Sequence, residues 1–152
     1  MPATTVTNPN IGGAFDPSRD MDLTGTVGVA KGLTSYGATQ GVGYSTGAGA
    51  VVTQATSKST GVTLNNICGT ITMNGAQLNT VTSVQFVLTN SAIAATDVVI
   101  VNLKSGNTAG SYFVSVDAVA AGSATISLRN YSGGNLSEAV VLSFAVIKAV
   151  AA

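Results

Sequence analysis

A serine flanked by glycines, Gly43-Tyr44-Ser45-Thr46-Gly47, is the first segment of this chain that could do chemistry. The spacing is that of a nucleophile elbow, where a strand-to-helix turn exposes a serine hydroxyl. Such a serine needs a base to take its proton, and the usual base is histidine. The 152 residues include no histidine, so a Ser–Lys dyad with Lys58 is the alternative that stays open. We interpret the segment as a Gly/Ser hinge.

Other site patterns are incomplete. Gly41-Val42-Gly43 begins like a dinucleotide fingerprint, but Thr46 stands where the third glycine is needed. Residues 57–60 end like a phosphate loop and lack its upstream glycines. Three aspartates could offer oxygen ligands to calcium, but their spacing does not match an EF-hand: Asp16, Asp20 and Asp22. We therefore predict no cofactor, no metal site and no enzymatic activity.

The composition favours contact with other proteins. Only 8% of residues are charged and the formal net charge is zero, whereas ordinary domains have about 25% charged residues. Without a cationic patch, binding to nucleic acid or to an anionic membrane surface is not expected. The mean hydropathy of +0.43 indicates surfaces that are hidden in an assembly. The lone Cys68 and the absence of a secretory pattern at the N-terminus fit assembly in a reducing compartment.

The chain divides into an arm and a body. Residues 1–45 contain all three prolines and show no sustained periodicity, which predicts an extended N-terminal arm; residues 46–152 form the body. Disordered tails rarely carry apolar anchors like those found here, so we expect the arm to become ordered against other subunits. The expected contacts with the capsid or a neighbouring subunit are Ile11, Phe15, Met21, Leu23, Tyr36 and Tyr44.

The body is predicted to be all-β, an antiparallel, jelly-roll-like sandwich of about eight strands. Its alternating runs are short, are separated by turn residues and contain no helical periodicity. The predicted strands cover residues 50–56, 61–67, 69–73, 81–90, 97–103, 111–119, 123–130 and 139–149.

Two of these strands are apolar on both faces, the last strand and the strand 97–103. One face should line the core, and the other should pack on the arm or on another subunit. The predicted core includes Phe86, Leu88, Ile126, Leu128, Leu142 and Phe144. Phe113 also lies within a strand and is expected to be buried. Four dispersed tyrosines are the only plausible exposed aromatic platforms: Tyr36, Tyr44, Tyr112 and Tyr131.

Several segments of the body resemble capsid decoration (cement) proteins of tailed bacteriophages, of the jelly-roll or β-sandwich type. The first is residues 52–65 (VTQATSKSTGVTLN), followed by 69–74 (GTITMN) and 86–91 (FVLTNS). The resemblance closes with residues 136–140 (LSEAV) and 144–148 (FAVIK), and covers roughly residues 40–149. It implies a structural virion protein, and many such proteins are trimers on the outer shell.

The resemblance and the composition lead to one expected function with an alternative. We expect the chain to cement the outside of a phage capsid by stabilising contacts between major capsid subunits, with that protein and further copies of itself, as a homotrimer, as partners. Its expected location is the outer capsid surface, after assembly in the bacterial host cytoplasm. The alternative is a head-fibre or tail-spike component that binds a receptor or glycan.

Overall fold

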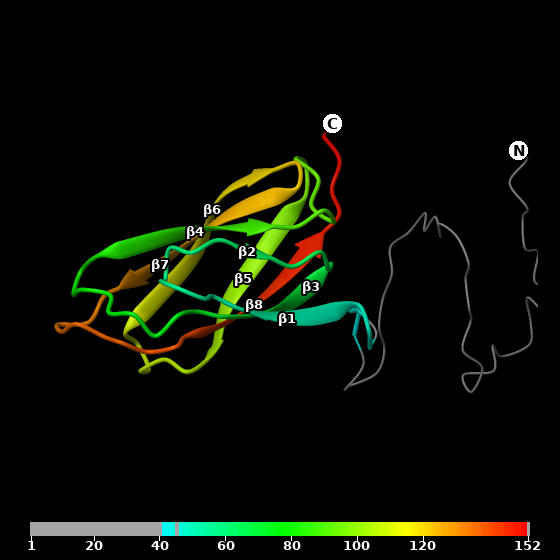
Figure 1. Cartoon of the computed structure of the whole chain (residues 1–152). Helices are drawn as coiled ribbons and strands as arrows, with labels where there is room; N and C mark the ends of the chain where they lie inside the picture. The colour runs from blue at the N-terminus through cyan, green and yellow to red at the C-terminus, as the bar shows by residue number, and fades with distance from the viewer. Residues whose placement is uncertain (1–40, 45, 152) are drawn as a thin grey trace, which may run out of the picture. The chain divides into compact units, whose positions relative to one another are not determined.

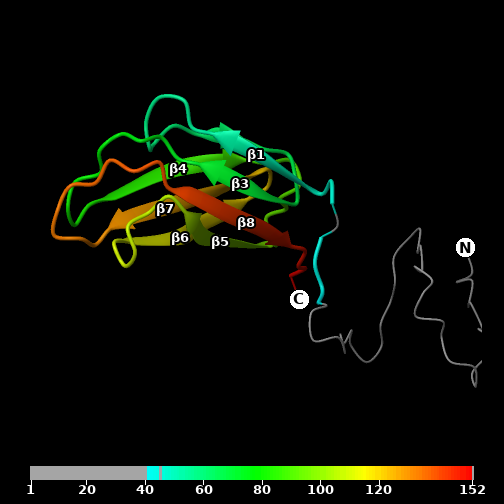
Figure 2. The ribbon, with the colours of Figure 1, turned by 90° about the horizontal axis from the view of Figure 1, so that it is seen from below.

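The computed structural model describes residues 41–44 and 46–151, and every regular element in that range is a β-strand. Two four-stranded sheets pack on each other (Figure 1). The first sheet has the strand order β1-β3-β8-β5 (Figure 2), and the second has the order β2-β4-β7-β6. The predicted all-β sandwich is confirmed. The strands are β1 (Gly49–Thr53), β2 (Val62–Thr63), β3 (Cys68–Thr72), β4 (Ser83–Thr89), β5 (Val98–Ser105), β6 (Tyr112–Ala120), β7 (Ser123–Asn130) and β8 (Val141–Ile147).

Most strand pairs are antiparallel, but the pairs at one side of the sandwich are not. The pairs β3–β8, β5–β8, β4–β7 and β6–β7 are antiparallel, whereas β1–β3 and β2–β4 are parallel. The first four strands alternate between the two sheets. Because the chain reverses direction at each crossing, strands two apart in sequence run the same way. The purely antiparallel expectation therefore fails at these two edge pairs.

The core lies between the sheets and is built by strict alternation. Every second residue of β7 and β8 is buried, as expected for strands with one face toward a core. All six predicted core residues are buried, with exposed fractions of 4% or less. The closest approach of backbone to core is at Gly69, where an added Cβ would lie 2.7 Å from the Ala50 oxygen and from the Leu64 side chain.

Two fully buried asparagines fix the loops at the sandwich ends. Asn90 donates from Nδ2 to the Asn66 oxygen (2.7 Å) and accepts at Oδ1 from the Ala92 N–H (2.9 Å). Asn130 donates to the oxygens of Leu78 (3.1 Å) and Gly134 (2.9 Å). Since buried amides are costly unless bonded, these two residues specify the loop conformations.

Strand β6 departs from the expected facing of its aromatic residues. Tyr112 is buried (7% exposed) and is not a surface platform, while Phe113 is 57% exposed and is not in the core. The pairing explains the exchange, because Tyr112 lies opposite the inward Asn130 and Phe113 opposite Arg129 on the outer face. The sequence prediction therefore placed Tyr112 and Phe113 on the wrong faces of this strand.

Candidate interaction surface

The residues predicted to bind partners fall mostly outside the described range. Ile11, Phe15, Met21, Leu23 and Tyr36 lie outside it, so their contacts stay predictions.

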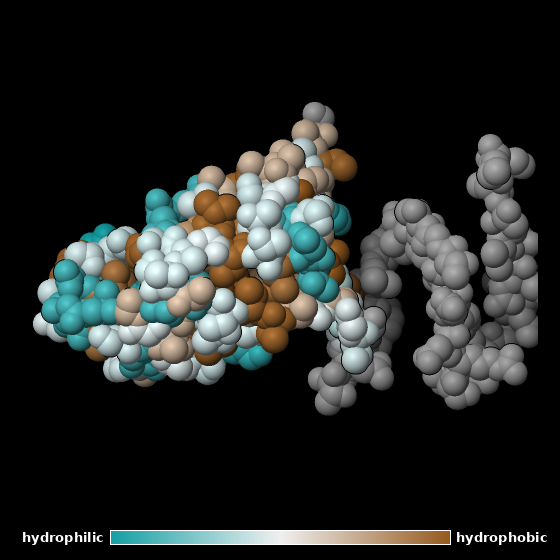
Figure 3. Space-filling view, viewed as in Figure 1, coloured by the Kyte–Doolittle hydropathy of each residue, from teal (hydrophilic) through white to brown (hydrophobic). Residues whose placement is uncertain are grey.

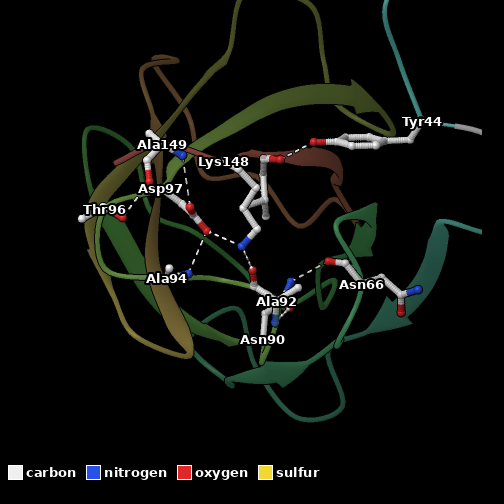
Figure 4. A network of polar contacts seen from close by, with 10 residues as sticks. Tyr44, Asn66, Asn90, Ala92, Ala94, Thr96, Asp97, Lys148 and Ala149 are labelled. Atoms are coloured by element: carbon white, nitrogen blue, oxygen red, sulfur yellow. Dashed lines mark hydrogen bonds and ion pairs between the residues drawn. The ribbon is translucent and has the colours of Figure 1, made fainter. Parts of the chain in front are cut away.

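Tyr44 is the one that the structure places. Its hydroxyl donates a hydrogen bond to the Val146 main-chain oxygen (Figure 4), and its ring remains partly exposed. This bond attaches the start of the body to the end of β8.

The outer face of the first sheet carries four exposed large aliphatic side chains among threonine, serine and asparagine residues. It is formed by alternate residues of the four strands, counted from Gly49, Cys68, Val98 and Val141. Its large side chains are exposed: Val51 (78%), Val98 (52%), Ile147 (48%) and Ile100 (42%). Figure 3 shows the edge of the sandwich, with hydrophobic surface (brown) in the middle of its view near β1 and β2. The predicted second apolar face of β5 and β8 is therefore present.

Small residues make this outer face shallow between its apolar rows. One row across the sheet is formed by Ile100, Ala145, Cys68 and Gly49, which pair in this order. The side chains in this row become smaller from β5 to β1. An open hollow of about 410 Å³ lies there, lined mainly by β1 and β3 and by Phe144. The row could receive a partner's protruding side chain.

Charge is nearly absent from the same sheet. Lys104 is the one charged residue in β1, β3, β5 and β8, and its ammonium reaches across β8 to the Thr70 hydroxyl (3.2 Å). Burying this face against a partner would therefore desolvate very few charges, and desolvation of unpaired charge is the main cost of a polar interface.

The outer face of the second sheet is polar by comparison. Its β4 and β7 rows are largely Ser and Thr. Asp117 accepts hydrogen bonds from Gln85 Nε2 (2.5 Å) and from the Ser115 hydroxyl (2.9 Å). Val87, 44% exposed, is the large apolar residue of β4 on this face. The two sides of the sandwich thus differ sharply in what they could contact.

An exposed aromatic cluster lies at one end of the second sheet. The rings of Phe113 and Tyr131 are 57% and 58% exposed, with centroids 6.4 Å apart and planes at 85°. The guanidinium carbon of Arg129 lies 4.8 Å from the Tyr131 ring centroid, a cation–π distance. Tyr131 is exposed, as expected of an aromatic platform.

Lys58 braces the loop between β1 and β2. It is 3% exposed, and its ammonium donates to the main-chain oxygens of Asn74 (2.6 Å) and Glu138. The buried Gln54 amide donates to the oxygens of Lys58 (3.0 Å) and Thr60 (2.8 Å). Burial lowers the pKa of Lys58, and the Glu138 carboxylate opposes that effect. The ammonium is engaged structurally, whereas Ser45, its partner in the Ser–Lys alternative, lies outside the described residues.

Glu138 and Tyr112 meet beside this brace. Glu138 Oε1 accepts a hydrogen bond from the Thr108 hydroxyl (2.6 Å), and this bond is the main cause that lowers the pKa of Glu138. Its Oε2 atom and the Tyr112 hydroxyl are buried without hydrogen-bond partners. Burial, reinforced by the Glu138 carboxylate, raises the pKa of Tyr112 to about 12. The proximity of the two groups contributes to the raised pKa of Tyr112 and to the lowered pKa of Glu138.

Asp97 pins the C-terminal segment to the loop before β5 (Figure 4). It accepts hydrogen bonds from the Ala94 N–H (2.7 Å), the Lys148 ammonium (2.7 Å) and the Ala149 N–H (3.3 Å). The Ala94 N–H is the largest cause of the lowered pKa of Asp97, followed by Lys148. Lys148 also donates to the Ala92 oxygen. This ion pair is the one present in the part of the chain that the structure describes.

The described residues hold no cluster of metal-ligand side chains and no long apolar helix. Among residues 41–44 and 46–151, no three acidic or cysteine side chains gather closely enough to hold a metal ion. The same residues contain no helix long and apolar enough to cross a membrane. The chain after Ser45 turns into β1 and not into a helix, unlike a nucleophile elbow. The three aspartates considered for calcium lie outside the described range.

No protein-family model, curated protein or solved structure matches the chain. The resemblance to phage decoration proteins therefore stays a prediction from short segments.

Sequence reasoning missed two features: the buried contact between Lys58 and Glu138, and the exposed aromatic cluster at Phe113. The brace between Lys58 and Glu138 joins residues 80 positions apart, and no local pattern signals such a contact. The Phe113 cluster was detectable, because Phe113 alternates with Ser115 and Asp117 while Tyr112 alternates with Val114 and Val116. The polar partners on the Phe113 side indicate the outer face.

Proposed function

We propose that this chain is a structural virion protein that decorates and cements the outside of a phage capsid. It binds the major capsid protein and further copies of itself, as a homotrimer, on the outer capsid surface, after assembly in the host cytoplasm. It acts without catalysis, cofactor, nucleic acid or membrane. The support is the resemblance of five segments together with the surface described above.

The single observation that carries the proposal is the outer face of the first sheet. It combines four exposed large aliphatic side chains with one charged residue on four strands. Exposed apolar surface of this kind marks an interaction site in a stable protein. A cement protein needs such a face, because it must bind other subunits tightly without catalysis.

The segments that carry the resemblance also support a scaffold role. Lys58 (residues 52–65), Asn74 (residues 69–74) and Glu138 (residues 136–140) come from three of them and meet in the buried brace. Their polar groups hold loops in place, which is what a rigid binding module requires. We infer that these segments maintain the body and that partner contact belongs to the outer surfaces.

The test is the copy number of the chain on purified virions and its binding to empty shells of the same virus. Quantitative mass spectrometry against the major capsid protein should give hundreds of copies per particle. Purified protein should also co-sediment with empty shells lacking it and raise their disruption temperature. A handful of copies, or no binding to shells, would contradict capsid cementing.

A second candidate function is a head-fibre or tail-spike component that binds a receptor or glycan. The observation in its favour is the exposed Phe113–Tyr131 pair, because flat rings can stack on sugar faces. A low copy number with specific glycan binding would support this alternative.

A further inference from the structure

The aromatic cluster at the end of the second sheet extends to a turn with an unusual backbone. The turn at residues 79–82 is tied to the segment after β7 by bonds from the Asn130 N–H to the Thr82 oxygen (3.0 Å) and from the Thr80 hydroxyl to the Ser132 oxygen (2.5 Å). Val81 in that turn is 60% exposed and has a φ of +56°. A second large apolar side chain is therefore displayed beside the segment that carries Tyr131.

The backbone conformation of Val81 is energetically unfavourable for its residue type. A β-branched residue in the left-handed region is a genuine outlier, since Gly or Asn would adopt it more easily. Such outliers cluster at ligand-binding sites. An exposed apolar side chain in this conformation suggests that its contact partner lies outside this chain.

The cluster is held rigid from below. The Tyr131 N–H donates to the oxygen of the buried Ser111 (2.8 Å), and the fully buried Asn130 accepts at Oδ1 from the Ser132 N–H (2.9 Å). The backbone at Tyr131 and at the following Ser132 is thus fixed by hydrogen bonds. A preorganised site loses less conformational entropy when a partner binds.

Arg129 lacks an acidic partner within the described residues. It takes part in no ion pair there, and its Nε atom is buried without a hydrogen bond. The acid on the neighbouring strand, Asp117, is already bonded to Gln85 and Ser115. A guanidinium is a planar fork that matches a carboxylate, so charge complementarity calls for a carboxylate from the ligand.

A protein surface fits this arrangement better than a sugar. Covering a sugar would bury several hydroxyl groups, and each needs a hydrogen-bond partner. The amide of Asn130 and the hydroxyl of Ser132 beside the rings are already engaged within the chain. What remains beside the rings is apolar area, one cation and the hydroxyls of Ser83 and Ser127, and Tyr with Arg is the composition typical of protein–protein hot spots.

We infer that Val81, Phe113, Arg129 and Tyr131 form a hot spot for a protein partner that presents a carboxylate beside an apolar side chain. This inference rests on the proposed function, in which the partner is the major capsid protein. The hot spot is separate from the first-sheet outer face, which serves contact between copies of this chain. One molecule can then contact its own copies and the shell through different sides.

The test measures binding of the full-length chain to empty shells of the same virus by co-sedimentation. Arg129→Gln and Phe113→Ser should each weaken binding about tenfold or more, as expected for hot-spot residues. Arg129→Lys keeps the charge and loses the fork, so it should fall between wild type and Arg129→Gln. Raising the salt concentration should weaken the wild type more than Arg129→Gln, because salt screens the ion pair.

The matched control is Val87→Ser, a similarly exposed apolar residue on the same outer face, which should change binding less than about twofold. Val81→Asn suits the positive φ, so it should keep or raise the melting temperature and still weaken binding. Each variant is checked for unchanged melting and unchanged self-association.

The outcomes separate the two proposals. If wild type binds shells and the cluster variants bind equally well, this inference is overturned and the proposed function stands. If wild type does not bind shells, the proposed function fails, and the inference fails with it. Binding to an acidic oligosaccharide that Arg129→Gln abolishes, with shell binding unchanged, would also overturn it in favour of a glycan site.

Discussion

At the scale of single residues, most polar groups of the body serve its own architecture. Gln54, Lys58, Asn90, Asp97 and Asn130 are all buried, and each side chain bonds to at least one main-chain group of a distant segment. Buried polar groups specify a conformation because leaving them unbonded is costly. A chain with only 8% charged residues therefore has few ionic groups left for partners, and Arg129 is notable among them.

The burial of Phe144 gives the first prediction. Phe144→Ala should lower the free energy of unfolding by about 3–5 kcal/mol, because it opens a cavity in the core, where Phe144 is 4% exposed. The control Phe113→Ala removes the same atoms from a side chain that is 57% exposed and should cost far less. Urea unfolding of both variants measures the difference. Equal losses would mean that the facing of β6 or β8 is misassigned.

Tyr112 gives a prediction about alkaline pH. Its pKa is raised to about 12, above the ordinary value of about 10, so the folded state holds the phenol proton more tightly than the unfolded chain. This stabilisation is fully present below about pH 10 and is lost as the pH rises toward 12. Tyr112→Phe should therefore lose less stability than wild type between pH 9 and 12, measured by urea unfolding at each pH.

At neutral pH the same substitution should be nearly neutral. The Tyr112 hydroxyl lies near enough to the Glu138 carboxylate to raise its pKa but makes no well-aligned hydrogen bond with it, so its removal should cost little. A loss above about 2 kcal/mol at pH 7 would indicate that the hydroxyl is bonded after all.

The residue scale also shows what the sequence could and could not predict. Leu142, Phe144 and Val146 alternate so regularly that their burial was predictable from period alone. Tyr112 and Phe113 were assigned the wrong way round, because adjacent aromatic residues hide the alternation that the following Ser115 and Asp117 reveal. The buried Lys58 could not be predicted, since its partners are 16 and 80 residues away.

At the scale of elements, strand positions followed from the sequence and strand partners did not. Turn residues separate the alternating runs, so each predicted strand overlaps an observed one. Pairing depends on how the chain crosses between layers, which local patterns do not encode. The parallel β1–β3 and β2–β4 pairs are the consequence that sequence reasoning missed.

Gly69 gives a prediction for the β1–β3 pair. A Cβ at this position would lie 2.7 Å from the Ala50 oxygen and 3.0 Å from the Phe144 ring, so Gly69→Ala must push β1 away or displace the core. Thermal unfolding should show a clear loss of stability, roughly 1–3 kcal/mol. The control Gly133→Ala adds a methyl group where no atom lies within 4 Å and should change little. Equal behaviour of the two variants would show that β1 packs less closely on β3 than described.

At the scale of the whole molecule, the two sides of the sandwich are proposed to bind different partners: the first sheet binds copies of this chain, and the second sheet binds the shell. The first-sheet outer face carries four exposed large aliphatic side chains and one charged residue, whereas the second sheet exposes Val87 and carries the Arg129 cluster at one end. A protein that ties copies of itself to a shell needs two distinct surfaces. Simultaneous contacts through both would raise the overall affinity through effective concentration.

Self-association through the first-sheet outer face is the fourth prediction. Sedimentation at micromolar concentration should show a trimer for the full-length chain. Ile100→Lys places a charge on that face at its β5 edge strand and should shift the protein toward monomer, because an unpaired charge would be buried. Val87→Lys is the matched control, since the two residues are 42% and 44% exposed on opposite sides. A monomeric wild type, or equal dissociation by the two variants, would contradict a role for this face in self-association.

The last prediction concerns residues 1–40, the part of the predicted arm that lies outside the described range. Every buried core residue that the structure describes lies between Val62 and Val146, so a chain that begins at Gly41 retains this core and should fold. It should also retain the bond of Tyr44 to Val146. Ordering an extended segment costs about 1–2 kcal/mol per residue in backbone entropy, so residues 1–40 would be ordered only by a large contact area on neighbouring subunits. Deleting them should leave thermal unfolding of the body nearly unchanged, weaken binding to empty shells and lower the temperature at which particles burst. If the truncated protein bound shells as tightly as the full chain, the arm would be dispensable, and cementing would have to rest on the sandwich surfaces alone.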